Sequence, residues 1–179
     1  MIGPKGHHVG ARQVASPNCD ARPPNAAVTL LVLHSISLPP GEFGGDAIER
    51  LFTNRLDPAA HRAFAELQAL RVSAHFLVRR DGELIQFVPV HRRAWHAGAS
   101  RWRGRARCND FSIGVELEGS EDRAYPDAQY AQLAALAQSL RRALPLREIA
   151  AHSDIAPGRK SDPGRMFDWP RLLRALARA

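Results

Sequence analysis

Apolar positions along the chain alternate between two patterns, one typical of strands and one typical of helices. Residues 28–34, VTLLVLH, are continuously apolar, which predicts a strand buried on both faces. Residues 111–119, FSIGVELEG, place apolar side chains at every second position and predict a strand with one polar face. Residues 73–90 hold two apolar runs around Asp-Gly, a strong hairpin signal. Residues 146–152 predict a further strand.

Helical spacing appears in three segments between and after these strands. Residues 57–70 place Phe64, Leu67 and Leu70 on one face, and residues 127–144 repeat apolar side chains over a longer amphipathic helix. Residues 168–179 predict a closing helix with Asp168 as its N-cap. The interleaving indicates an α/β fold, with a central mixed sheet flanked by helices.

The predicted elements belong to one domain over residues 1–179. Residues 1–27 form a polar, proline-rich lead-in that we expect to be irregular, and residues 37–45, SLPPGEFGG, predict a loop at the site. We found no internal repeat and no linker long enough to separate two domains. A chain of this length can bury a substantial core, and we expect a monomer.

Composition and charge narrow the class of protein. No run approaches the roughly 18 apolar residues of a membrane span, and the first residues lack the apolar core of a secretory signal, so we expect a cytoplasmic protein. Two cysteines without paired spacing suit a reducing compartment. The formal net charge is +7, but the arginines are spread along the chain and no nucleic-acid-binding motif accompanies them. We therefore expect no nucleic acid or membrane partner.

Two histidines stand at the ends of predicted strands. His34 ends the first strand and His152 ends a later one, so both imidazoles emerge at one sheet edge if the strands are neighbours. With Asp162, ten residues further on, they supply a three-ligand catalytic zinc site. The same ligand types also describe a two-histidine, one-carboxylate iron site, although the helices argue against the β-rich barrels that usually hold it. Asp154 is the competing carboxylate, which we interpret as a turn or cap residue.

Two further residues suit hydrolysis of an amide at such a centre. Glu116 lies on the polar face of its strand, where it could take a proton from water and deliver it to the leaving nitrogen. Lys160 is one of only two lysines among 25 basic residues, in the same loop as His152 and Asp162. A mobile ammonium there could stabilise the oxygen that gains charge in the tetrahedral intermediate.

These segments resemble the N-acetylmuramoyl-L-alanine amidases, specifically the cytosolic enzymes of peptidoglycan recycling. The similarity runs from about residue 9 to residue 174 without large gaps. It is carried by LLVLHSISLPPGEFGG, LRVSAHFLVRRDGELIQFVP, RAWHAGAS, RCNDFSIGVELEG, YPDAQYAQL and HSDIAPGRKSDPG. The resemblance implies a mixed sheet flanked by helices. It also implies zinc-dependent hydrolysis of the amide between the lactyl group of 1,6-anhydro-N-acetylmuramic acid and L-alanine.

The resemblance also implies roles for individual residues. His34, His152 and Asp162 match the zinc ligands, Glu116 the catalytic carboxylate, and Lys160 the lysine beside the scissile carbonyl. Substrate contacts are expected at four positions: Arg71, Arg107, Ser35 and His96. Ser35 stands where close relatives commonly have Asn, which puts recognition of the sugar or peptide in doubt but not the metal set. For His96 a packing or supporting role beside the metal is the alternative.

The sequence leaves two other function classes open. The first is a broader amidase acting on intact cell wall, against which the absence of an export signal and of a wall-binding segment argue. The second is a non-catalytic peptidoglycan-binding module, the expected fate of relatives that have lost ligands. The presence of all three ligand residues together with Glu116 and Lys160 favours an enzyme. The predicted substrate is therefore a cytosolic anhydromuropeptide.

Overall fold

The computed structural model describes residues 1–177, and its strands and helices interleave along the chain. The strands are β1 (Arg12–Gln13), β2 (Cys19–Ala21), β3 (Leu30–Ile36), β4 (Phe76–Val78), β5 (Leu84–Gln86), β6 (Arg92–Ala94), β7 (Arg101–Trp102), β8 (Arg105–Ala106), β9 (Ser112–Glu118) and β10 (Glu148–Ala151). The helices are α1 (Ala47–Phe52), α2 (Asp127–Ala143), α3 (His152–Ile155) and α4 (Trp169–Ala177), with two 3-10 helices, η1 (Arg62–Leu67) and η2 (Cys108–Asp110).

Six strands form the central sheet, in the order β1-β5-β4-β9-β3-β10. Strand β3 pairs in parallel with both β9 and β10, and β9 pairs in parallel with β4. The β4–β5 hairpin adds the antiparallel pair that makes the sheet mixed. The prediction of a single α/β domain with a mixed sheet is confirmed. Because β3, β9 and β10 are parallel, their carboxyl ends meet at one edge, where open α/β sheets commonly bind ligands.

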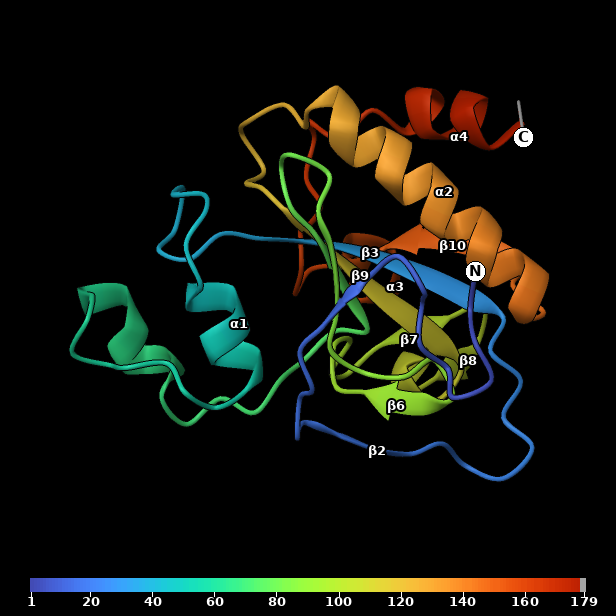
Figure 1. The fold of residues 1–179 in the computed structure, drawn as a ribbon, viewed down its shortest axis with the longest axis horizontal. Coiled ribbons are helices and arrows are strands. Elements are labelled where there is room, and N and C mark those ends of the chain that lie inside the picture. Colours follow the sequence, from blue (N-terminus) through green and yellow to red (C-terminus); the bar gives the residue numbers. More distant parts are fainter. Residues whose placement is uncertain (178–179) are drawn as a thin grey trace.

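Helices cover both faces of the sheet, as Figure 1 shows. On one face α2 and α4 lie side by side over Leu31, Leu33, Ile113, Val115 and Leu117, which point to that face by strand alternation. On the other face α1 and η1 pack over the β4–β5 hairpin. Ile155, the last residue of α3, and Cys108 of η2 pack over β3 and β10 on that second face. The second face therefore carries two separate clusters, and the even-numbered residues at the end of β3 lie between them.

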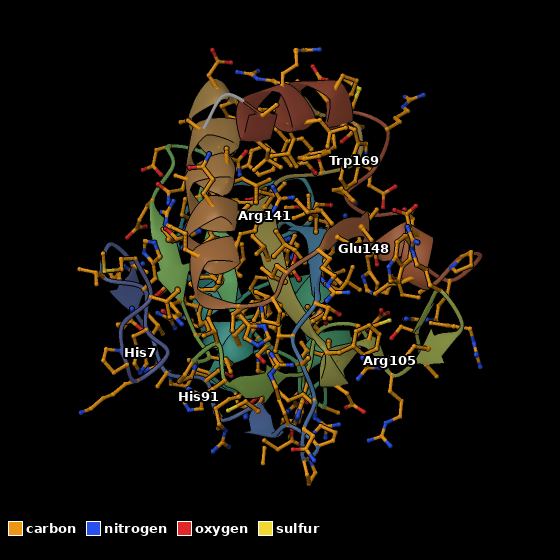
Figure 2. All side chains as sticks on the ribbon, turned by 90° about the vertical axis from the view of Figure 1, so that its right-hand side faces the viewer. His7, His91, Arg105, Arg141, Glu148 and Trp169 are labelled. Atoms are coloured by element: carbon orange, nitrogen blue, oxygen red, sulfur yellow. The ribbon has the colours of Figure 1, made fainter. Side chains whose placement is uncertain are left out.

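The closing helix begins where the sequence predicts. The Asp168 carboxylate accepts a hydrogen bond from the backbone N–H of Arg171 at 2.8 Å, so Asp168 caps α4. Trp169, labelled in Figure 2, stacks edge-on against Phe167 at a ring distance of 4.9 Å. The last two residues of the predicted helix, 178 and 179, lie outside the described residues. No helix within residues 1–177 has the length and apolar character needed to cross a membrane.

The prediction of an α-helix over residues 57–70 is wrong. The structure has only the 3-10 helix η1, preceded by turns, and Leu70 is 42% exposed. The reason lies in the spacing, because Phe64, Leu67 and Leu70 recur at every third position. A repeat of three matches the 3-10 helix, whereas an α-helix needs a mixture of three and four. This segment is a rim of the site rather than a core helix.

Three smaller differences concern short elements that were not predicted and the end of one strand. The lead-in over residues 1–27, expected to be irregular, contains β1 and β2. Helix α1 was not predicted, although its buried Ile48, Leu51 and Phe52 have helical spacing. The strand expected over residues 146–152 ends at Ala151, and His152 opens the short helix α3. This last change turns the His152 side chain back across the end of β3.

His75, the residue before β4, is fully buried, and its imidazole connects the backbone of β9 to that of β6. Its Nδ1 accepts the N–H of Gly114 at 3.0 Å, which leaves Nε2 to donate to the carbonyl of Arg92 at 3.0 Å. Burial and the nearby charge of Arg22 lower the pKa of His75 to about 3. The imidazole is thus neutral in the folded protein, whereas in the unfolded chain it takes up a proton below pH ~6.5.

This difference predicts acid sensitivity that depends on His75. The unfolded state binds more protons between pH ~6.5 and ~3, so stability falls as the pH falls through that window. Between pH 7 and pH 4.5 His75 alone is expected to remove about 2–3 kcal/mol of unfolding free energy. Urea unfolding in the presence of a metal chelator at the two pH values tests this, with His75→Asn losing less stability than wild type. His91→Asn, at an exposed position, is the control; equal losses in all three proteins would refute the prediction.

Candidate active site

The sheet register brings His34 and Glu116 side by side. His34 pairs with Glu116 across β3 and β9, so both side chains project from the face opposite α2. Ala151 pairs with Leu33 across β10 and β3, and a histidine follows each of them: His34 within β3 and His152 as the first residue of α3. The expectation that His34 and His152 emerge at one sheet edge is therefore confirmed. Parallel pairing of neighbouring strands is what makes their carboxyl ends coincide.

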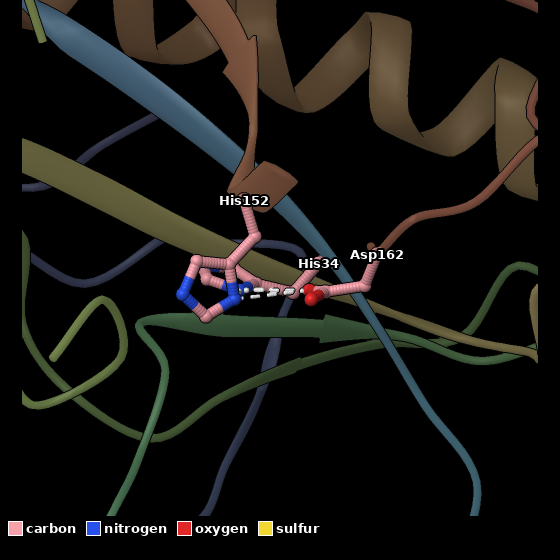
Figure 3. A group of neighbouring side chains, drawn as sticks. All are labelled: His34, His152 and Asp162. Carbon is pink, nitrogen blue, oxygen red and sulfur yellow. Dashed lines mark hydrogen bonds and ion pairs between the residues drawn. The ribbon is translucent and has the colours of Figure 1, made fainter. Parts of the chain in front are cut away.

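His34, His152 and Asp162 converge on one point, as Figure 3 shows. The Nδ1 atoms of the two imidazoles lie 2.9 Å apart. One carboxylate oxygen of Asp162, Oδ2, lies 3.3 Å from Nδ1 of His34 and 3.1 Å from Nδ1 of His152. Three ligands at zinc distances on a tetrahedron are about 3.3 Å apart, so this triangle is close to that geometry.

The electrostatics of the three residues also suit a cation. Burial lowers the pKa of His34 to about 4, so its imidazole is neutral and offers a lone pair. Burial alone would raise the pKa of Asp162, but the adjacent imidazoles of His152 and His34 outweigh it and hold the pKa below its usual range. Nδ1 of His34 and Nδ1 of His152 face each other, so only one of them can donate a proton to the other. A metal ion placed there would accept the lone pairs of both nitrogens and of the Asp162 carboxylate. Two imidazoles and a carboxylate are the ligand types that zinc takes in hydrolases.

The loop after His152 folds back to deliver Asp162. The Asp162 carbonyl accepts the backbone N–H of Ser153 at 3.1 Å, which ties the end of the loop to its beginning. The competing aspartate, Asp154, points elsewhere, because its Oδ2 accepts the N–H of Ala151 at 2.8 Å. Asp154 thus caps α3, and its interpretation as a cap residue is confirmed. Asp162 is the carboxylate that joins the histidines.

The two glutamates on the polar face of β9 have different environments. Glu118 is 2% exposed and pairs with Arg79 at 2.9 Å, and it also accepts the N–H of Gly44 at 2.6 Å. Glu116 has a buried oxygen, Oε2, with no hydrogen-bond partner within residues 1–177. Burial and the negative charge of Asp162 raise the pKa of Glu116 well above its usual range, and the positive charge of Lys160 opposes this. A carboxyl without a partner and with a raised pKa is suited to proton transfer.

A cavity of about 500 Å³ opens above these groups. The three metal-binding candidates, Glu116 and Lys160 all line it. One wall is apolar and comes from α1 and the segment around η1, with Leu51, Phe52, Leu67 and Leu70. The opposite wall is the polar loop from Arg159 to Asp162. A ligand here meets an apolar side, a basic side and the convergent polar groups between them.

The structure brings some of the expected substrate contacts to the cavity and not others. Ser35 and His96 line it. Arg71 and Arg107 are exposed and do not line the cavity, so their role in substrate binding stays a prediction. Arg107 instead pairs with Asp110 at 3.3 Å. Sequence reasoning missed the wall that Leu51 and Phe52 supply, and the helical spacing of Ile48, Leu51 and Phe52 was the signal.

The sequence matches proteins whose activity is known. Residues 24–165 match the family described as N-acetylmuramoyl-L-alanine amidase. The 1,6-anhydro-N-acetylmuramyl-L-alanine amidase AmpD of Escherichia coli is 58% identical over 96% of this chain and 95% of its own length. The AmpD of Haemophilus influenzae is 46% identical over 96% of this chain and 95% of its own length.

Solved structures give the same relationship. The crystal structure of an AmpD selenomethionine derivative superposes with a TM-score of 0.96 at 53% identity, covering 98% of this chain and 99% of that chain. AmiD of E. coli, solved with anhydro-N-acetylmuramic acid-L-Ala-D-gamma-Glu-L-Lys as substrate, superposes with a TM-score of 0.61 at 30% identity. That match covers 86% of this chain and 60% of AmiD.

Proposed function

Because the chain belongs to the N-acetylmuramoyl-L-alanine amidase family, we propose that it hydrolyses the amide between 1,6-anhydro-N-acetylmuramic acid and L-alanine. The substrate is then an anhydromuropeptide of peptidoglycan recycling, the cell compartment is the cytoplasm, and the protein acts as a monomer. The observation that carries the proposal is the unpartnered carboxyl of Glu116 beside three convergent ligand atoms at the base of a cavity.

His34, His152 and Asp162 would hold one zinc ion. When bound there, zinc supplies Lewis acidity and makes a water molecule acidic enough to act near neutral pH. Glu116 lies on the neighbouring strand and takes a proton from the attacking water, because its own oxygen has no competing donor. The same carboxyl then delivers that proton to the leaving nitrogen of L-alanine, which completes hydrolysis of the amide.

Lys160 serves the oxygen of the scissile carbonyl. Its backbone N–H is fixed by the carbonyl of Ala156 at 3.1 Å, while its side chain lines the cavity. The long flexible stem lets the ammonium follow the oxygen as it gains negative charge. In a site with an apolar wall such a donor stabilises the transition state more than the ground state.

The test is product analysis with a defined substrate. The zinc-loaded protein is incubated with anhydromuramyl-tripeptide, and mass spectrometry identifies the products. Free tripeptide and free anhydro-sugar, which disappear after chelation and return with zinc, are the expected result. A parallel incubation with intact cell wall separates the alternatives: release of peptide only from the wall would replace the proposal with a wall amidase. A folded, zinc-loaded protein that cleaves neither would refute amidase activity.

Lys160 can be tested on its own. Lys160→Ala is expected to lower kcat by about 10²–10³-fold, the usual effect of losing one donor to a developing oxyanion. The zinc content should not change, because Lys160 is not a ligand. Lys5→Ala removes the chain's other lysine, outside the cavity, and should leave kcat at the wild-type value. Wild-type kcat in Lys160→Ala would show that the ammonium takes no part in the reaction.

A further inference from the structure

The two metal-binding histidines direct their second ring nitrogens to adjacent residues. Nε2 of His34 lies 2.9 Å from Nδ1 of His96, and Nε2 of His152 lies 3.2 Å from the carbonyl oxygen of Ala97. A neutral imidazole that offers Nδ1 to a metal carries its proton on Nε2 and needs an acceptor there. The carbonyl of Ala97 can only accept. His96 can play the same part for His34 only if its Nδ1 is unprotonated.

The surroundings of His96 decide where its proton lies. The hydroxyl of Ser112 donates to the carbonyl of Cys108 at 2.6 Å, so the only proton of that hydroxyl is already used. Nε2 of His96 lies 3.1 Å from the same hydroxyl oxygen and must donate to it. His96 is therefore protonated on Nε2, and its Nδ1 is free to accept from His34. The chain of donors runs in one direction and leaves the Nδ1 lone pair of His34 for the metal.

Packing fixes the His96 ring in this position. The ring lies against Gly114 of β9, where an added Cβ would come within 2.4 Å of the ring carbon Cγ. The side-chain oxygen of Asn109 accepts the backbone N–H groups of His96 and Ala97, at 3.2 and 2.8 Å. One asparagine thus holds both residues that receive the protons of the two metal-binding histidines.

We propose that His96 is a positioning residue of the metal centre: it accepts the Nε2 proton of His34 and so fixes the ring orientation and tautomer that bind the metal. This inference rests on the proposed zinc site. Both ring nitrogens of His96 are engaged, so it offers no free donor or acceptor to a substrate although its ring lines the cavity. The role replaces the substrate contact that the sequence suggested for this residue.

Three variants of the full-length protein test the role by zinc affinity, measured by competition with a chromophoric chelator. His96→Leu removes the acceptor and is expected to weaken zinc binding about 10–100-fold, the usual effect of losing such a partner. His96→Asn keeps an oxygen near the position of Nδ1 and should bind zinc within about threefold of wild type. Gly114→Ala retains every polar group but displaces the ring, and should weaken binding about 10-fold.

Two further readouts separate positioning from loss of fold. Thermal unfolding of the zinc-free proteins checks that each variant is folded at the assay temperature. The visible spectrum of the cobalt-substituted proteins should change in His96→Leu and be restored in His96→Asn. Wild-type affinity and spectrum in His96→Leu would overturn the inference, as would a folded His96→Asn that binds as weakly as His96→Leu. Wild-type protein that binds no zinc would instead refute the zinc site itself.

Discussion

Replacing Glu116 by Gln is expected to lower kcat by about 10³-fold or more while zinc stays bound. General acid–base catalysis contributes about 10²–10⁴-fold, and Glu116 is proposed to act twice, on the water and on the leaving nitrogen. Glutamine has almost the same shape, so the cavity and the three ligands should not move. Single-turnover kinetics with anhydromuramyl-tripeptide, together with metal analysis of the same sample, measure both quantities. Loss of zinc in Glu116→Gln would mean that the glutamate is itself a ligand.

Glu118 provides a matched control on the same face of the same strand. Glu118→Gln leaves the buried Arg79 without its nearest counter-charge at 2.9 Å. Breaking a buried pair costs about 3–5 kcal/mol, and the remaining partner of Arg79, Glu49 at 3.0 Å, should hold the loss near the lower end. We expect lower stability in urea but wild-type kcat per folded molecule. Equal kcat losses in both variants would indicate a general effect of charge in β9 and not proton transfer by Glu116.

Asp162→Ala is expected to abolish both zinc binding and turnover. Removing even a supporting partner of a metal ligand weakens affinity about 10–100-fold, and removal of a ligand should exceed that. The effect also appears in stability: at free zinc 1,000 times its Kd, wild type should gain about 4 kcal/mol and the variant almost none. Calorimetric titration and urea unfolding with and without zinc measure the two effects.

Asp154 is the control for Asp162, because both aspartates lie in the short segment that follows β10. Asp154→Ala removes the hydrogen bond to the N–H of Ala151 and should cost about 1 kcal/mol of stability. Zinc affinity should stay within a few-fold of wild type. The opposite result, zinc loss in Asp154→Ala and retention in Asp162→Ala, would reassign the carboxylate ligand.

The main strands of the sheet could be predicted because each has a local hydrophobic pattern that is typical of a strand. The continuous run before His34 predicts burial on both faces, and β3 is buried in that way. The alternation around Glu116 correctly predicts a strand, but its polar face is buried as well, because Glu116 faces the cavity and Glu118 pairs with Arg79. The segment over residues 57–70 could not be assigned from its apolar content alone. Apolar residues three positions apart suit a 3-10 helix, and a mixture of three and four positions suits an α-helix, so the two patterns differ by a single position. Helix α1 was missed because six residues are too few for a strong pattern, and tertiary packing stabilises so short a helix.

The convergence of the three candidate ligands could be predicted, whereas the walls of the cavity could not. His34 and His152 lie where two neighbouring parallel strands end, so topology brings them together, and Asp162 joins them only because the loop after α3 folds back. The cavity walls come from α1 and the η1 region: the spacing of Ile48, Leu51 and Phe52 is a signal for a short helix, but the place where that helix packs depends on tertiary contacts. The choice between two roles for His96 depends on the direction of hydrogen bonds through Ser112, which no sequence pattern indicates. Arg71 and Arg107 remain predictions.

The order of the ligands along the chain has a consequence for biosynthesis. His34 and His152 are separated by 118 residues, and Asp162 follows near the end of the described chain. A ribosome must therefore translate β10 and the loop beyond it before the three ligand atoms can meet. A nascent chain that stops short of Asp162 lacks at least the carboxylate of the three-residue set. If zinc binds as proposed, its uptake is a late step, and a bound ion would mark a polypeptide that has been synthesised and folded through to this loop.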